Sequence, residues 1–214
     1  MLIKYDFFNL FFKKYSMTSI QIVWHKNPDT DATLSAIIMC DFLTKKWYET
    51  TPYIQWELNK ETEYLLSKYN ILKPEIKTHL DSTQEVCLVD HNEVPQSINN
   101  LSECIVTWLV DHHKMDFKTS SPINIRIEPL CSTASILYKM YLEAGFEISK
   151  EIATMMLACI MSDSLLWKSP TSTQEDKEIA KELQKISEIS DLEVFAMPMF
   201  QAKSDLGDMP IKNV

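Results

Sequence analysis

The side chains of this sequence that could do chemistry are acidic and imidazole groups placed at the ends of apolar segments. Three such segments are each followed directly by a metal-type ligand, and the first is soon followed by two more. The residues concerned are His25, Asp29, Asp31, Asp90, Asp111 and His112. Carboxylates and imidazoles together suit Mn²⁺, Co²⁺, Zn²⁺ or Fe²⁺, and the set contains no thiolate that would favour zinc.

The acidity of this set indicates more than one metal. Four or more carboxylates gathered at one place would repel one another unless divalent cations neutralised them. Two metals about 3.5–4 Å apart can share a bridging hydroxide and clamp both sides of a phosphoryl group. The set therefore predicts metal-assisted hydrolysis of a phosphate compound.

Each of these residues also has a simpler interpretation when it is taken alone. Asp31 is well placed to cap the N-terminus of a helix, and Asp29 could form an Asx turn. His91 is expected to be an exposed loop residue and is left out of the metal set. The metal interpretation is favoured by the Val-Asp-His triplet, which occurs at 89–91 and again at 110–112. Packing alone does not explain two such triplets at the ends of apolar segments.

Alternating strands and helices must position these residues. Apolar segments typical of strands occur at 20–24, 51–57, 86–89, 105–110 and 123–127, and helical patterns occur at 32–46, 61–69, 133–144, 150–161, 173–189 and 192–203. This alternation predicts an α/β fold with a mainly parallel open sheet and flanking helices. Ligands of such sheets bind outside the carboxyl ends of the strands, where the predicted metal ligands fall. A capping box is expected at 172–175.

The composition is that of an ordinary globular protein and excludes several classes. The net charge of −9 argues against nucleic-acid binding, and it requires a phosphate substrate to be attracted locally. No apolar stretch is long enough to span a membrane, and the N-terminal segment lacks a cleavage site typical of a signal peptide. The odd number of cysteines, 5, without a Cys-x-x-Cys pair indicates buried reduced thiols. A cytoplasmic location is therefore expected.

Glycine is scarce, with only 2 in 214 residues. Few positions can then adopt positive φ at low cost, so most turns are expected to use Asn, Asp, Ser and Pro.

Four motifs in order are more specific than any single residue. They are HKNPDTD at 25–31, VDHNE at 89–93, DHH at 111–113 and SDSLLWKSPT at 162–171. Together they resemble a manganese-dependent (family II) inorganic pyrophosphatase of the DHH phosphoesterase superfamily, from about Ile20 to Met209. The resemblance implies hydrolysis of pyrophosphate to two orthophosphates at a dinuclear Mn²⁺ or Co²⁺ centre with a bridging hydroxide. It also implies a third Mg²⁺ arriving with the substrate, and a homodimer.

The resemblance implies a role for each residue of these motifs. The first metal would be held by His25, Asp29 and Asp90. The second would be held by Asp31, Asp90, His112 and Asp163. Asp90 would be shared, and Asp163 is assigned by the resemblance alone. The catalytic residues would be Asp90 and His113, with His113 donating a hydrogen bond to the substrate phosphate. Asp111 would orient a ligand histidine, and Lys168 is a weak candidate for a substrate contact.

The sequence departs from the family pattern in three ways. Trp24 and Cys131 stand where the family usually has Gly, and positive φ at either position would cost about 1–3 kcal/mol. The family also has a C-terminal lid domain whose basic residues close over the substrate, and the resemblance implies that the sequence ends before it.

The sequence motifs and their resemblance to the family also predict how the chain is organised. It is an extension at 1–16, with Met17 as the favoured start, a metal-binding catalytic domain at 17–209 and a tail at 210–214. Two alternatives to a pyrophosphatase remain open. One is a single-domain phosphoesterase that acts on another small phosphate ester, and the other is a truncated, non-catalytic metal-binding remnant.

Overall fold

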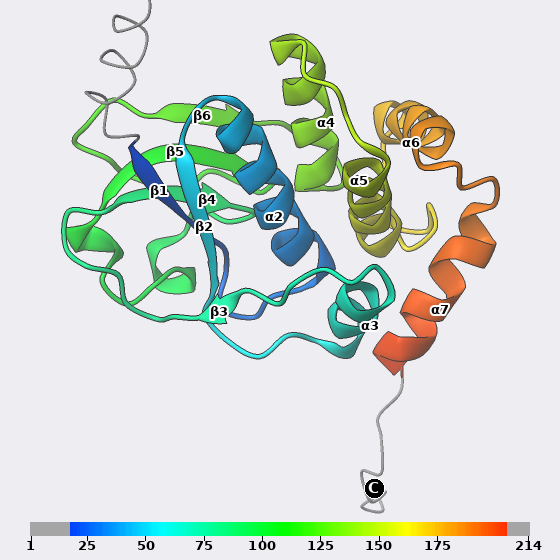
Figure 1. The fold of residues 1–214 in the computed structure, drawn as a ribbon, viewed down its shortest axis with the longest axis horizontal. Helices are drawn as coiled ribbons and strands as arrows, with labels where there is room; N and C mark the ends of the chain where they lie inside the picture. Colours follow the sequence, from blue (N-terminus) through cyan, green and yellow to red (C-terminus); the bar gives the residue numbers. More distant parts are fainter. Residues whose placement is uncertain (1–17, 205–214) are drawn as a thin grey trace, which may run out of the picture.

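The structure is a computed structural model that describes residues 18–204 (Figure 1). The expected extension at 1–16, the start at Met17 and the tail at 210–214 lie outside the described residues. The domain boundaries therefore stay predictions.

A six-stranded parallel sheet forms the centre of the described chain, in the order β3-β2-β1-β4-β5-β6. Its strands are β1 (Ser19–Val23), β2 (Glu49–Ile54), β3 (Glu75–Ile76), β4 (Glu85–Val89), β5 (Ile105–Asp111) and β6 (Asn124–Ile127). The predicted α/β class and parallel sheet are confirmed. Only β3 was not predicted, because two exposed residues carry no apolar pattern.

The strand order reverses at β1, which lies between β2 on one side and β4 on the other. β1 and β4 are also the best-buried strands, with four of five residues buried in each. In an open α/β sheet, the crevice for a ligand forms at the carboxyl ends of the strands where the order reverses. The segments that follow β1 and β4 therefore border that crevice.

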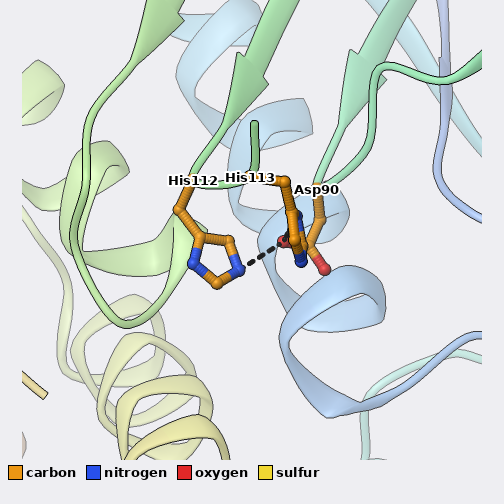
Figure 2. Close-up of side chains that lie close together, drawn as sticks. All are labelled: Asp90, His112 and His113. Atoms are coloured by element: carbon orange, nitrogen blue, oxygen red, sulfur yellow. Dashed lines mark ion pairs between the residues drawn. The ribbon is translucent and has the colours of Figure 1, made fainter. Parts of the chain in front are cut away.

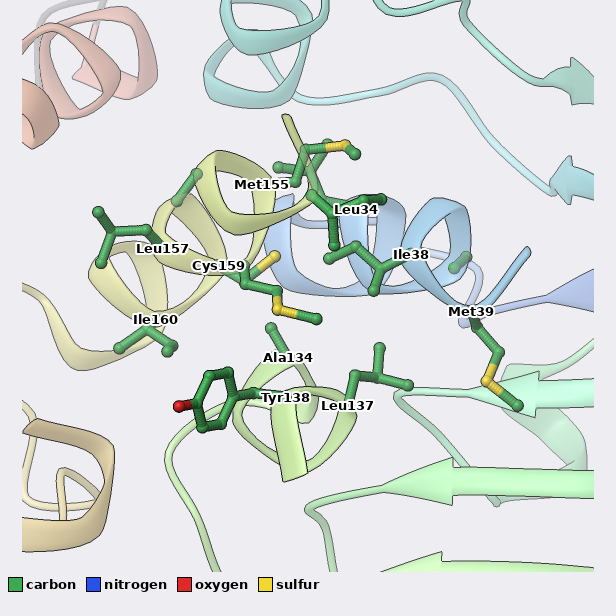
Figure 3. Close-up of a cluster of buried hydrophobic side chains, with 14 of the residues drawn as sticks. Leu34, Ile38, Met39, Ala134, Leu137, Tyr138, Met155, Leu157, Cys159 and Ile160 are labelled. Atoms are coloured by element: carbon green, nitrogen blue, oxygen red, sulfur yellow. The ribbon is translucent and has the colours of Figure 1, made fainter. Parts of the chain in front are cut away.

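The six α-helices of the described chain lie on one side of the sheet (Figure 1). They are α2 (Thr30–Lys45), α3 (Lys60–Lys68), α4 (Thr133–Ala144), α5 (Lys150–Ser164), α6 (Gln174–Ser187) and α7 (Leu192–Ser204). α2 and α4 contact the strands, and α5 packs on both of them. Figure 3 shows apolar side chains of α2, α4 and α5 meeting between these three helices. This core fixes the positions of α4 and α5 relative to α2. It therefore also fixes the residues at the ends of these helices.

The opposite face of the sheet has a thinner cover. Two short 3₁₀ helices, η1 (Val94–Gln96) and η2 (Leu101–Glu103), lie among the loops there. Buried side chains such as Leu88, Ile98 and Leu109 form a second, smaller apolar cluster. None of the helices within 18–204 is long and apolar enough to cross a membrane.

The cysteines are free, as predicted from their number and spacing. Cys87, Cys131 and Cys159 are buried, whereas Cys40 and Cys104 are half-buried. Burial raises the pKa of the Cys40 thiol to about 12, so it is protonated at neutral pH.

Two predicted helix caps are wrong. Asp29, not Asp31, caps α2, and its Oδ1 accepts a hydrogen bond from the backbone N–H of Ala32 at 2.9 Å. Thr173 caps α6 and Asp176 is its reciprocal partner, so the capping box spans 173–176 rather than 172–175. Because α2 begins at Thr30, Asp31 lies inside the first turn and its carboxylate is free to make other contacts.

Positive φ is taken mostly by residue types that were not predicted to take it. Within 18–204 the non-glycine residues concerned are Trp47, Asn70, Thr83, Asp90, Leu165, Leu166, Trp167 and Glu188. Only two of these are Asn or Asp. Trp24 and Cys131 are not among them, so the strain considered for those two positions does not arise.

A left-handed turn follows α5. Leu165, Leu166 and Trp167 have φ of 48°, 52° and 67°, and they come directly after the end of the helix. A residue with a Cβ pays roughly 1–2 kcal/mol in this conformation. The turn is therefore a strained segment beside the predicted ligand Asp163.

The strain can be measured with a glycine substitution at Leu165, the C-cap of α5, whose side chain is half-exposed. Leu165→Gly is expected to raise the free energy of unfolding by about 1 kcal/mol, because glycine takes positive φ without a steric penalty. Urea unfolding of the two proteins measures the difference. The matched control is Leu142→Gly, which replaces an exposed leucine inside α4. It is expected to lower the free energy of unfolding by about 1 kcal/mol. A loss at both positions would contradict the assignment of strain to the turn.

Candidate metal centre

The predicted ligands meet at the carboxyl edge of the sheet, where the strand order reverses. Within the described chain, three groups of His and Asp have one ligand atom each within 4.8 Å of the others. The groups are His25 with Asp29 and Asp90, Asp31 with His112 and Asp163, and Asp90 with His112 and His113. The His25 group is identical to the first ligand set that the resemblance implies. The second set consists of the Asp31 group together with Asp90, which belongs to the third group and is linked to the Asp31 group through His112. We call His25, Asp29 and Asp90 the first group, and Asp31, Asp90, His112 and Asp163 the second group.

Asp90 joins the groups. Its Oδ1 lies 3.3 Å from Nε2 of His112, and Figure 2 shows these two side chains beside His113. Its Oδ2 lies 3.5 Å from Nε2 of His25. The residue is 1% exposed and has φ of 60°. Its backbone N–H donates to the carbonyl of Val110 at 2.9 Å, which continues the pairing of β4 with β5 past the end of β4. The sheet thus holds Asp90 in a conformation that its own sequence would disfavour.

Asp31 is fully buried and is held by the N-terminus of α4. Its Oδ1 accepts hydrogen bonds from the hydroxyls of Ser132, at 2.7 Å, and Ser35, at 2.9 Å. Its Oδ2 accepts from the backbone N–H of Thr133 at 2.7 Å. Asp31 therefore does satisfy a helix N-terminus, but that of α4 rather than that of its own helix. Ser132 and Thr133 were not among the predicted site residues. A Ser-Thr pair at the start of a helix is the capping signal that could have indicated them.

His112 faces the second group through one nitrogen. Its Nδ1 is 3.0 Å from the carbonyl of Leu130, so Nδ1 carries a proton and Nε2 is the nitrogen turned toward the cluster. Nε2 is 3.9 Å from Oδ2 of Asp31 and 3.9 Å from Oδ2 of Asp163. Asp163 reaches this place from the last turn of α5.

Asp111 was expected to orient a ligand histidine, and the histidine that it contacts is His113, the residue expected to face the substrate. Its Oδ1 lies 2.8 Å from Nδ1 of His113. Its other oxygen accepts a hydrogen bond from Asn92 at 2.6 Å. Asn92 and Asp111 thus form a chain that fixes His113, whose Nε2 is left as its remaining polar atom.

His91 is buried rather than exposed, with 2% of its surface accessible. Its Nδ1 is 3.0 Å from the carbonyl of Val89, and its Nε2 has no hydrogen-bond partner within the described residues. Burial lowers the pKa of His91 to about 4, so the imidazole is neutral. The Glu and Asn that follow it in the sequence suggested a loop, but the turn after β4 folds inward.

The electrostatics of the cluster favour positive charge. Burial disfavours the imidazolium of His25, yet Asp29 and Asp90 raise its pKa to about 10. In the same way Asp90 outweighs burial and raises the pKa of His112 to about 9. The two histidines hold the pKa of Asp90 well below its usual range although its burial acts in the other direction. Without metal, protons on the histidines thus supply the cations that the carboxylates require.

The pKa values of two other buried acids shift upward, in the direction opposite to that of Asp90. Burial and repulsion by Asp90 raise the pKa of Asp31 to about 6. Burial and repulsion by Asp31 raise the pKa of Asp163 well above its usual range. A buried cluster that gains protons at its acids and at its histidines fits divalent cations, which would replace those protons.

A pocket of about 290 Å³ opens beside the cluster. It is lined by His25, Asn27, Asp29, Asp90, His91, Glu93, Gln96 and His113. These residues include the whole first group but only Asp90 of the second. The structure does not bring Lys168 into this pocket, since it lines another one with Trp167 and Asp191.

Comparison with known proteins identifies relatives of this chain. Residues 19–160 match the DHH family, N-terminal domain. The chain is 44% identical over 200 residues to a probable manganese-dependent inorganic pyrophosphatase of Staphylococcus saprophyticus, covering 92% of this chain and 64% of the relative. It is 40% identical over 196 residues to a protein of the same description from Deinococcus radiodurans, covering 91% and 62%. The chain thus spans a little less than two thirds of the length of these relatives.

Solved structures support the same relationship. A candidate family II inorganic pyrophosphatase of Methanococcus jannaschii superposes with a TM-score of 0.81 at 36% identity, covering 89% of this chain and 63% of that one. An exopolyphosphatase-related protein from Bacteroides fragilis has a TM-score of 0.62 at 18% identity, which shows a shared fold alone. The family match includes all the candidate metal ligands except Asp163. From the match over 19–160, we conclude that this chain belongs to the DHH family, whose N-terminal domain it contains.

Proposed function

We propose that this chain hydrolyses inorganic pyrophosphate to two orthophosphates at a centre of two divalent metals. The observation that carries the proposal is the sharing of Asp90 between two ligand groups, because one carboxylate with a histidine on each side is the arrangement that two adjacent metals require. The identity of 40–44% to probable manganese-dependent inorganic pyrophosphatases supports the choice of substrate.

The ligand sets follow from the two groups. The first metal would be held by His25, Asp29 and Asp90, and the second by Asp31, Asp90, His112 and Asp163. Mn²⁺ or Co²⁺ at these positions would supply Lewis acidity toward the phosphate oxygens and a water of lowered pKa as the nucleophile. The oxygen and nitrogen ligands fit such borderline cations better than they fit Mg²⁺ or Ca²⁺.

His113 is the side chain placed to act on the substrate itself. It lines the pocket, and its side chain is 48% exposed. Hydrogen bonding to Asp111 raises its pKa, so the imidazole tends to carry a second proton on Nε2. With Nδ1 engaged by Asp111, Nε2–H is the donor left for a phosphate oxygen, where it stabilises the charge that develops during bond cleavage.

The substrate would need more positive charge than the pocket offers. Within the described part of the chain no lysine or arginine lines the pocket, while Asp29, Asp90 and Glu93 do. A pyrophosphate anion would therefore bind best with a cation of its own, which fits a third Mg²⁺ that arrives with the substrate. We also propose that the protein is a homodimer, as the resemblance implies, and that it works in the cytoplasm, where five free thiols persist.

The proposal predicts metal-dependent release of orthophosphate. The purified chain with Mn²⁺ or Co²⁺ is expected to hydrolyse pyrophosphate, and Asp90→Asn is expected to lower the rate by at least about 100-fold, more than the loss typical of outer-sphere changes. Asparagine tolerates the positive φ of this position, so the variant tests charge rather than strain. Asp81→Asn, at an exposed position before β4, is the matched control. A colorimetric phosphate assay measures both.

Other outcomes separate the alternatives. Release of phosphate from a model phosphoester but not from pyrophosphate would favour a phosphoesterase of different substrate. Mn²⁺ binding without turnover of either compound would favour a non-catalytic metal-binding chain. Either result contradicts the proposed substrate.

The raised pKa values predict how metal binding depends on pH. Protons on His25 (pKa about 10) and His112 (about 9) must leave before Mn²⁺ can bind, so Mn²⁺ affinity is expected to rise from pH 6 to pH 9. Titration calorimetry in buffers of different ionisation enthalpy should show proton release on binding. An affinity that stays constant over this range would contradict the proposed ligand role of the histidines.

The same shifts predict the stability of the metal-free protein. Its folded state binds these protons more tightly than the unfolded chain, where a histidine has a pKa of about 6.5. The stabilisation is therefore complete below that pH and is lost as pH rises toward 9–10. Urea unfolding with a chelator present is expected to show a fall from pH 6.5 to pH 9, and saturating Mn²⁺ should abolish the fall. A rise in the chelated protein would contradict the assignment.

A further inference from the structure

We propose that the N-terminus of α4 is a positioning device for the second metal, and that Thr133 is its central residue. The inference rests on the proposed metal centre and goes beyond it by assigning a function to residues that are not ligands. The contacts of two buried carboxylates, Asp31 and Asp90, carry the argument.

The first contact fixes Asp90. The hydroxyl of Thr133 donates a hydrogen bond to Oδ1 of Asp90 at 2.8 Å. Oδ1 is also the oxygen nearest to His112, at 3.3 Å, whereas Oδ2 faces His25. Within 18–204, Thr133 is the one residue outside the histidines whose side chain bonds to this carboxylate. Its hydroxyl therefore fixes the orientation of the Asp90 carboxylate between the two groups.

The second set of contacts fixes Asp31. Its Oδ1 takes the hydroxyls of Ser132 and Ser35, and the backbone N–H of Ala134 approaches the same oxygen at 3.4 Å. Among the described residues, the hydrogen bond that Oδ2 accepts comes from the backbone N–H of Thr133. This leaves Oδ2, the oxygen 3.9 Å from His112, with free acceptor capacity toward the second group. The N-terminus of a helix stabilises negative charge, so the same contacts favour the ionised form that a metal needs.

The device acts unequally on the two metals. Among the described residues, 132–134 make no hydrogen bond to His25 or Asp29. Asp29 instead caps its own helix, and its side chain is 43% exposed. Of the first group, only the shared Asp90 is held by α4, whereas two acids of the second group are held by it. A fault in this device should therefore weaken the second metal more than the first.

Asp176 anchors the device from behind. This fully buried carboxylate accepts hydrogen bonds from the backbone N–H of Cys131, at 3.1 Å, and from the hydroxyl of Ser135, at 2.7 Å. It also closes the capping box of α6 with Thr173. The first turn of α6 therefore holds both sides of the segment 132–134 and sets its distance from the cluster.

The experiment measures Mn²⁺ binding rather than turnover. The full chain is titrated with Mn²⁺ by calorimetry and by electron paramagnetic resonance, and the wild type is expected to bind two ions with spin coupling between them. Thr133→Val is expected to weaken one site by roughly 10–100-fold and to leave the other within about 2-fold, with loss of the coupling signal at limiting Mn²⁺. Thr133→Ser, which keeps the hydroxyl, is expected to restore both. Thr154→Val removes a hydroxyl from α5 that bonds only to Lys150, and should change neither.

A second pair of variants keeps the test valid if Thr133→Val does not fold. Ser132→Ala and Ser149→Ala each remove the N-cap side chain of a helix, α4 and α5 respectively. Similar losses of stability are expected from both, but only Ser132→Ala should weaken a Mn²⁺ site. Equal Mn²⁺ binding by this pair, or wild-type binding by Thr133→Val, would overturn the inference while leaving the proposed function intact. A wild-type chain that binds no Mn²⁺ would contradict the proposed function itself.

Discussion

The constraint on which the rest of the structure depends is the mutual repulsion of carboxylates gathered at one end of the sheet. Asp29, Asp31, Asp90 and Asp163 contribute ligand atoms to groups that share Asp90 and His112. Burying such charges without compensation is costly. The fold compensates with two histidines, with the N-terminus of α4 and with protons held at raised pKa, and each compensation points to the place where a cation would stand.

The backbone around the cluster carries strain that follows from the same constraint. Asp90 has positive φ at the end of β4, and a left-handed turn follows Asp163. Neither conformation is favoured by the residues that adopt it. Both are imposed by the packing on either side, through the sheet for Asp90 and through the core of α2, α4 and α5 for the turn. Because glycine is scarce, leucine and tryptophan occupy positions of positive φ that glycine would adopt without this conformational cost.

Sequence patterns predicted most of the fold, because apolar periodicity and strand-to-helix alternation are local signals. Five of the six strands and all six helices were expected near their observed positions. The candidate metal ligands could also be predicted from the sequence, since strand ends and motifs mark them. Contacts between distant segments were not. Ser132 and Asp31 are 101 residues apart, so nothing local indicated that Asp31 would serve α4 rather than α2.

The errors have the same physical origin. Asp111 was expected to orient a ligand histidine and lies against His113, because the side-chain directions at the end of β5 depend on Leu130 and Asn92, which belong to other segments. His91 was expected in solvent, but the turn after β4 folds it under the pocket. Polar residue types mark a turn, whereas tertiary packing decides which way that turn faces.

The two ligand groups differ in how firmly the surrounding residues hold them. The centre therefore has an enclosed side and an open side. The second group is enclosed by α4 and α5, and Asp31 has no exposed surface. The first group borders the pocket, where the side chains of Asp29 and His113 are 43% and 48% exposed. A ligand from solvent therefore meets the first group and His113 before it meets the second. In the proposed two-metal centre, the enclosed second group would preserve the spacing of the metals, and the exposed first group would allow ligands to exchange as phosphate enters and leaves. The unequal burial of the two groups thus fits the proposal of a centre that stays assembled during turnover.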